Sequence, residues 1–169
     1  IAAAAHVGVE VTVAIAALSA FPGVKRRMEQ LGIVDGVPVY DDFAHHPTAI
    51  RTTLEGLRGR VGQQRIWAVI EPRSNTMRLG AHKDGLAASA AAADQVIWYQ
   101  PSGLDWDLVP VVADSPVPAE VASDVTAVVA RLVTETRPGD AVVIMSNGGF
   151  GGIHQKLLAA LREKSGAAA

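Results

Sequence analysis

Apolar residues follow two spacings along this chain, and the two spacings alternate from residue 65 to the end. Short apolar runs at residues 65–70, 95–99 and 141–145 are each bounded by turn-forming or polar residues, which predicts buried strands. A similar run at residues 109–113 predicts a further strand. Buried strands of this kind are typical of the centre of a parallel sheet.

Longer segments between these runs carry apolar residues at the spacing of an amphipathic helix. Residues 47–57, 81–93, 121–132 and 153–161 show this pattern, and Pro47 suits the first helical position. Strands that alternate with helices predict an α/β fold with a mainly parallel sheet. We therefore expect a Rossmann-like three-layer domain with helices on both faces of the sheet.

The first strands are expected to form an N-terminal hairpin. Residues 26–34 and 37–40 are extended runs joined by Asp35-Gly36, a dipeptide that favours a two-residue hairpin turn. A basic cluster at residues 25–27 opens the hairpin. This cluster either reaches an anionic ligand or forms an exposed basic strand edge that opposes aggregation.

The chain divides at a cluster of helix-breaking residues. Residues 1–20 predict two short Ala-rich helices broken near Gly8, and Phe-Pro-Gly at 21–23 is the expected domain boundary. The main domain would span residues 21–164, and residues 165–169 would be a disordered tail. The apolar opening indicates a piece of a longer protein.

The composition of the chain excludes several classes of function. The 169 residues are 49% hydrophobic, carry a net charge of -2 and include no cysteine. A near-neutral chain lacks the basic field that attracts nucleic acid or anionic membranes, and it holds neither disulfides nor thiolate zinc sites. Because Glu10 interrupts the apolar opening and no basic segment precedes it, we expect neither a signal peptide nor a membrane span. The cysteine-free sequence fits a cytoplasmic protein.

Three polar segments fall at the predicted carboxyl ends of strands, where α/β sheets bind their ligands. The first, residues 41–48, holds two carboxylates and two imidazoles. They could orient a ribose hydroxyl, contact a phosphate or bind a metal, although no third metal ligand is evident. Alternatively, Asp41 or Asp42 ends the hairpin and His46 caps the following helix.

The second segment, residues 71–78, is dense in hydrogen-bonding groups. Arg73 or Arg78 could clamp a carboxylate with two parallel hydrogen bonds, and Ser74 and Asn75 could bind an amide. The alternative is a solvated loop in which Ser74 or Asn75 caps a helix.

The third segment, residues 146–154, places four glycines between a buried strand and a helix. Glycine allows a ligand to approach the backbone, and a helix N-terminus favours an anion. Neither the P-loop pattern nor the dinucleotide pattern fits. The loop therefore meets a carboxylate or a peptide as readily as a phosphate, or is a structural turn.

Taken in order, these segments resemble the Mur ligase family of ATP-dependent amide ligases. The resemblance rests on residues 21–29 and 41–48, and residues 71–78 and 146–156 resemble the member that takes a tripeptide. It implies the C-terminal domain of a three-domain enzyme, with residues 1–20 as the last helices of the central domain. That enzyme would join L-Ala-γ-D-Glu-meso-diaminopimelate to UDP-N-acetylmuramate in peptidoglycan recycling.

The resemblance also implies ligands and partners. ATP and Mg²⁺ would be bound mainly by the central domain, no catalytic residue would lie in this piece, and the domain would close on its own N-terminal and central domains. ATP would be contacted by Arg27, Asp42 and His45. The tripeptide would be contacted by Arg73, Ser74, Asn75, Ser146, Asn147 and Phe150. Met28 stands where many relatives have phenylalanine. The alternatives are the C-terminal domain of UDP-N-acetylmuramate–L-alanine ligase and a nucleotide-binding module without catalysis.

Overall fold

The expected α/β architecture is present in a computed structural model, which describes residues 1–21, 23–74, 77, 79–80 and 82–167. Within these residues, six strands form one sheet in the order β1-β2-β6-β3-β4-β5. The strands are β1 (Glu29–Val34), β2 (Val37–Asp42), β3 (Ile66–Ile70), β4 (Gln95–Tyr99), β5 (Ala119–Ala122) and β6 (Ala141–Met145). Only β1 runs antiparallel to its neighbour, and the other pairings are parallel.

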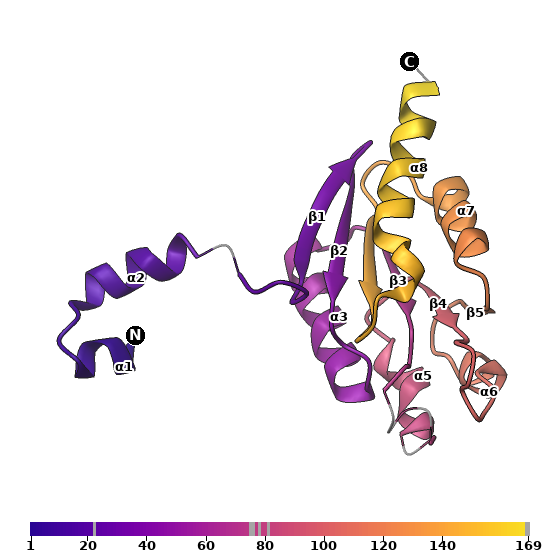
Figure 1. Cartoon of the computed structure of the whole chain (residues 1–169), viewed down its shortest axis with the longest axis horizontal. Coiled ribbons are helices and arrows are strands. Elements are labelled where there is room, and N and C mark those ends of the chain that lie inside the picture. Colours follow the sequence, from indigo (N-terminus) through magenta and orange to yellow (C-terminus); the bar gives the residue numbers. More distant parts are fainter. Residues whose placement is uncertain (22, 75–76, 78, 81, 168–169) are drawn as a thin grey trace.

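Helices cover both faces of this sheet (Figure 1). The larger helices are α3 (Pro47–Val61), α7 (Val125–Glu135) and α8 (Ile153–Ala167), and the shorter ones are η1 (Lys83–Gly85), α5 (Leu86–Ser89), α6 (Val109–Ala113) and η2 (Phe150–Gly152). Strand β3 shows why two layers of helix are needed, because every residue in it is buried. Ile66, Ala68 and Ile70 pack with α3, α5 and α6. Trp67 and Val69 face the opposite way and pack with α7 and α8.

The predicted hairpin is confirmed, with a later start. Asp35 and Gly36 both take positive φ angles, 50° and 71°, as a primed two-residue turn requires. The first strand begins at Glu29, because Arg26 and Met28 also have positive φ angles. Residues 24–28 therefore form a turn, and this turn lies next to the end of β2.

Two assignments between residues 109 and 125 were wrong. Residues 109–113 form the helix α6 rather than a strand, because a five-residue apolar run fits either structure and Pro110 suits a first helical turn. Val121 belongs to the edge strand β5, so α7 begins only at Val125, after the Asp124 side chain accepts a hydrogen bond from the Ala127 amide.

The predicted long helix at residues 81–93 is also shorter than expected. Lys83–Gly85 is a 3₁₀ turn, and only Leu86–Ser89 is α-helical. Ala90 lies in a turn and Ala93 in the irregular segment after it, and both are buried with the sheet in one apolar cluster. Alanine fits a helix well but also fits a tight turn packed against strands, so composition alone did not define the helix end.

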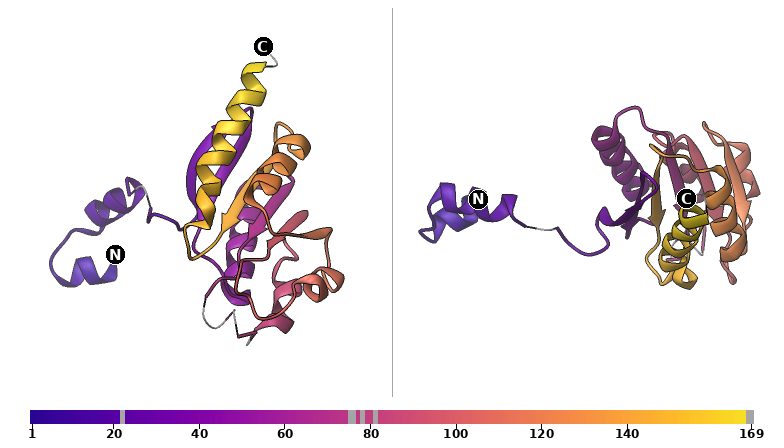
Figure 2. Two further views of the ribbon diagram at one scale, coloured as in Figure 1. Left: turned by 45° about the vertical axis from the view of Figure 1, so that its right-hand side comes forward. Right: turned by 90° about the horizontal axis from the view of Figure 1, so that it is seen from above.

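The N-terminal helices α1 (Ala2–His6) and α2 (Val11–Ser19) lie away from the sheet (Figures 1 and 2). The predicted break between them is confirmed at Gly8, whose φ is 84°. At the other end, α8 includes residues 165–167, which the sequence assigned to the tail. Among the described residues, no helix is both long and apolar enough to cross a membrane.

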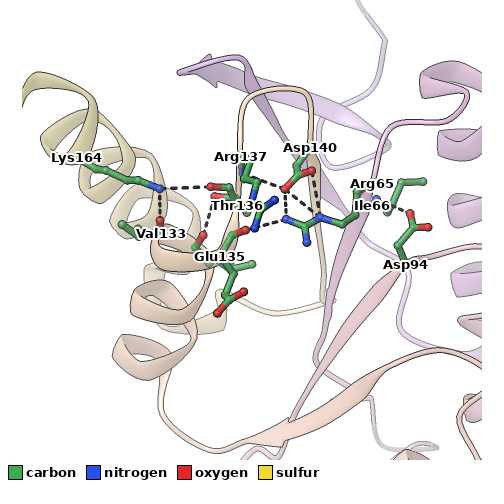
Figure 3. A network of polar contacts seen from close by, with 10 residues as sticks. Arg65, Ile66, Asp94, Val133, Glu135, Thr136, Arg137, Asp140 and Lys164 are labelled. Atoms are coloured by element: carbon green, nitrogen blue, oxygen red, sulfur yellow. Dashed lines mark hydrogen bonds and ion pairs between the residues drawn. The ribbon is translucent and has the colours of Figure 1, made fainter. Parts of the chain in front are cut away.

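A network of polar contacts stabilises the amino ends of the central strands (Figure 3). The Asp140 carboxylate accepts hydrogen bonds from the Arg65 guanidinium at 2.6 and 3.2 Å and from the Arg137 amide at 3.0 Å. Lys164 of α8 donates to the carbonyl of Val133 at 2.6 Å. These contacts lie at the opposite end from the polar segments, so they stabilise the sheet without entering the site.

Candidate functional site

The three polar segments meet at one edge of the sheet, as the sequence predicted. Strands β2, β6 and β3 are neighbours, and Asp42 and Ile70 both align with Met145. The Ser146 amide donates to the Asp42 carbonyl at 3.1 Å, and the Glu71 amide donates to the Met145 carbonyl at 2.9 Å. The backbone ladder thus places the three segments side by side.

Asp42 organises the first segment. Its Oδ1 accepts hydrogen bonds from the Ala44 amide at 2.8 Å and the Thr53 hydroxyl at 3.0 Å, and its Oδ2 accepts one from the Met28 amide at 2.8 Å. The residue is only 4% exposed. An ionised carboxylate offers about four acceptor positions, so most of the capacity of Asp42 is used within the protein.

Arg26 and Arg27 form a cationic turn beside this segment. Arg26 Nη2 donates to the carbonyls of Ser146 and Gly148 at 2.5 and 2.9 Å. The Arg26 and Arg27 guanidinium carbons lie 5.2 and 5.1 Å from the centre of the Phe43 ring, within cation–π range. Arg27 is exposed, so its charge is open to a ligand.

Asp41 joins this turn to the start of α8. Its Oδ2 lies 3.3 Å from Arg26 Nε, and its Oδ1 lies 3.1 Å from Nε2 of His154. The contact with His154 has ion-pair distance but not the angles of a hydrogen bond. Asp41 therefore joins β2 to the residue 24–28 turn through an ion pair and lies close to His154 of α8.

The two histidines of the first segment differ in their surroundings. His45 Nδ1 is 2.9 Å from the Phe43 carbonyl, and a carbonyl can only accept, so Nδ1 carries the proton and Nε2 is left for a ligand. His46 is exposed and precedes Pro47 at the N-cap of α3, without a side-chain capping bond. Partial burial and then the charges of His45 and His82 lower its pKa below 6.5.

Ser146 holds the glycine loop to the second segment. Its hydroxyl donates to Glu71 Oε2 at 2.5 Å and accepts from the Gly148 amide at 2.9 Å. Ser146 is fully buried and Glu71 is 3% exposed. The hydroxyl therefore has a structural partner on each side. Asn147, the next residue in the predicted tripeptide set, is half-buried.

A cleft of about 460 Å³ opens beside this pair. It is lined by Glu71, Arg73, Tyr99, Pro101, Ser102, Val125, Phe150 and Gly151. Phe150 is 1% exposed, and its ring centre lies 4.8 Å from that of Tyr99. Burial, followed by the negative charges of Glu71 and Asp124, raises the pKa of the Tyr99 phenol above 10.0. The carboxyl ends of β3, β4 and β6 thus enclose a small polar space.

Arg73 and Ser74 are compatible with both interpretations of the second segment, which are a ligand-binding segment and a solvated loop with a helix cap. Arg73 is exposed and lies against Gly148, where an added Cβ would come within 2.6 Å of its Nη1. The Ser74 hydroxyl accepts from the Met77 amide at 3.2 Å, which is the capping alternative. Asn75 and Arg78 lie outside the described residues.

Several residues of the site were not singled out from sequence. Glu71 and His154 lay inside polar segments but had no recognisable partner nearby, and Asp41 was not distinguished from Asp42. Arg26 belongs to the basic cluster at residues 25–27, but its contacts with the glycine loop follow only from the fold. Tyr99 also reaches the site through the fold, and local spacing contains no signal for it. The described residues contain no group of three or more acidic, histidine or cysteine side chains placed to hold a metal ion.

Comparison with known proteins places this geometry in a family. The chain is 52% identical over 169 residues to UDP-N-acetylmuramate--L-alanyl-gamma-D-glutamyl-meso-2,6-diaminoheptandioate ligase of Escherichia coli K12, covering 99% of the chain and 37% of the relative. It is 35% identical over 159 residues to UDP-N-acetylmuramate--L-alanine ligase of Saccharopolyspora erythraea, covering 89% of the chain and 32% of that relative.

A solved structure supports the same grouping. The crystal structure of the murein peptide ligase from Psychrobacter arcticus 273-4 superimposes with a TM-score of 0.76 at 52% identity, over 95% of this chain and 35% of that one. This chain therefore spans about a third of the length of these relatives. Residues 26–148 match the family described as Mur ligase, glutamate ligase domain, and the chain belongs to that family.

Proposed function

We propose that this chain is the C-terminal domain of an ATP-dependent amide ligase that joins L-Ala-γ-D-Glu-meso-diaminopimelate to UDP-N-acetylmuramate in peptidoglycan recycling. The single observation that carries the proposal is the 52% identity over nearly the whole chain to a ligase named for this tripeptide. The identity to a ligase named for L-alanine is 35%. The cleft at the carboxyl edge is where the peptide would bind in this proposal.

In the proposed reaction, ATP phosphorylates the muramyl carboxylate and the peptide amine attacks the resulting acyl phosphate. The new C–N bond replaces the C–O bond to phosphate, which leaves. The chain's own N-terminal and central domains would bind the UDP-sugar, ATP and Mg²⁺, so this domain would contribute no catalytic residue. Its part is to position the amine, which is a large component of such reactions.

Two sets of residues would meet the two ligands. Arg27 and the Nε2 atom of His45 are the open groups on the ATP side, and we assign Asp42 to the same side chiefly as the residue that orders their turn. Arg73 would bind a peptide carboxylate. The rest of the proposed tripeptide set is Ser74, Asn75, Ser146, Asn147 and Phe150. Of these, Ser146 and Phe150 are buried and would act by shaping the cleft.

The test is a ligation assay with the full-length protein that contains this chain. Phosphate release would be measured with UDP-N-acetylmuramate, ATP and either the tripeptide or L-alanine. We expect release that depends on the tripeptide and is at least about tenfold more efficient than with L-alanine. Equal or greater efficiency with L-alanine would instead support the L-alanine ligase, and no release with either would support the non-catalytic nucleotide-binding module.

A further inference from the structure

Glu71 is a buried carboxylate for which the described part of the chain supplies no cationic partner. It is 3% exposed, it lines the cleft, and its Oε2 accepts from the Ser146 hydroxyl. Among the described residues, no ion pair includes Glu71. Burying a charged group without a compensating charge is costly, and such a group in a native structure calls for an explanation.

The other buried carboxylates at this edge differ from Glu71. Asp41 has Arg26 and His154 within ion-pair distance. Asp42 accepts three hydrogen bonds, from its own loop, from the residue 24–28 turn and from α3. Within the described residues, Glu71 accepts from one neutral donor, and its negative charge contributes to the raised pKa of the Tyr99 phenol. Its negative charge is therefore directed at the cleft rather than neutralised by the fold.

The cleft carries opposite charges at separate positions. Glu71 lies in its buried wall, and the exposed Arg73 contributes the positive charge. Tyr99 and Ser102 add polar atoms, and Val125 adds apolar surface. A ligand that fits this pattern has an ammonium group for the buried end and a carboxylate for the exposed end. A free peptide with several carboxylates has both.

We propose that Glu71 docks the α-ammonium group of the incoming peptide and is the specificity residue for its free amino end. This inference rests on the proposed function and assigns one end of its amine substrate. The hydrogen bond from Ser146 fixes the carboxylate in the wall of the cleft, so the ammonium meets a preorganised partner. With the carboxylate of the peptide held by Arg73, the amine is oriented from both ends.

The test compares two ligands on the wild-type protein, on a Glu71 variant and on a control variant. Wild type and Glu71→Gln in the 169-residue chain would be titrated by NMR with the tripeptide and with its propionyl analogue, in which the L-alanyl ammonium is replaced by hydrogen. Glutamine keeps the size of the side chain and an acceptor for Ser146. Glu163→Gln, an exposed position on α8, is the matched control for the loss of one negative charge.

We expect wild type to bind the tripeptide about tenfold or more tighter than the propionyl analogue. Glu71→Gln should lose that difference and bind the two ligands alike, and Glu163→Gln should behave as wild type. The comparison of ligands on wild type does not depend on the folding of any variant.

Equal affinity of wild type for the two ligands, or no detectable tripeptide binding, would overturn the assignment of Glu71. A variant that retains the full preference for the ammonium form would overturn it as well. Tripeptide-dependent ligation by the full-length protein would still support the proposed function in each of these cases. A failure of ligation would instead count against the proposed function itself.

Discussion

The contact between Gly148 and Arg73 can be broken by one methyl group. An ideal Cβ at Gly148 would lie 2.6 Å from Arg73 Nη1, 3.0 Å from its Cδ and 3.2 Å from its Cζ. Favourable separations between such atoms are about 3.5 Å or more. The φ angle of Gly148 is not positive, so alanine is compatible with the backbone. In Gly148→Ala the guanidinium must therefore move by about 1 Å.

This displacement should affect ligand use far more than folding. The Arg73 side chain is exposed and flexible, so moving it should cost no more than about 0.5 kcal/mol, and alanine in place of glycine restricts the unfolded chain. A hydrogen bond between charged groups contributes about 1.5–3 kcal/mol. Losing even the lower amount corresponds to about a tenfold weaker interaction with a peptide carboxylate.

The assay is steady-state ligation by the full-length protein, together with thermal unfolding. For Gly148→Ala we expect the KM for tripeptide to rise about tenfold while Tm is maintained within about 2 °C. Gly149→Ala is the matched control, because a Cβ there meets no atom within 4 Å and the φ of Gly149 is -80°. An unchanged KM in Gly148→Ala, or an equal rise in both variants, would refute the reasoning.

Three further predictions concern charge. Asp140→Ala should lower stability by about 1–3 kcal/mol and Tm by about 2–4 °C per kcal/mol, measured by calorimetry. His45→Gln should move the pKa of His46 up toward 6.5 but leave it lower, because burial is the larger cause; NMR titration checks this. Since the unfolded chain takes up that proton first, stability attributable to His46 should fall as pH drops below about 6.5. Glu71→Gln should lower the raised pKa of Tyr99, again only in part, as measured by NMR of the phenol.

Local signals were sufficient for most of the fold. The apolar strand at residues 141–145 and the Asp35-Gly36 turn are determined by properties that a short window contains: continuous burial, and positive φ at both turn residues. The region from 81 to 125 was harder. The edge strand β5 is four residues long and only half-buried, so it lacks the continuous apolar run that identified the central strands.

The sequence predicted where the candidate site lies, but it did not predict which side chains contact one another there. Parallel topology alone brings the three polar strand ends together. Which side chains pair depends on contacts far apart in sequence, such as Ser146 with Glu71 and Asp41 with His154. The family resemblance predicts that Asp42 lies on the ATP side, but the sequence does not show that its carboxylate accepts hydrogen bonds from its own loop, from the residue 24–28 turn and from α3. Ser146 and Glu71, for example, are more than 70 positions apart in the sequence. No local pattern can therefore identify such a pair.

The glycine loop differs from a phosphate-binding loop in the groups that surround it. A phosphate-binding loop presents backbone N–H groups to an anion, but here the Gly148 amide donates to the Ser146 hydroxyl. The carbonyls of Ser146 and Gly148 accept from Arg26, and the absent side chain of Gly148 leaves room for Arg73. The loop thus accommodates the guanidinium groups of Arg26 and Arg73. An anion that approached this edge would meet the exposed Arg73 side chain, which would suit the proposed peptide carboxylate.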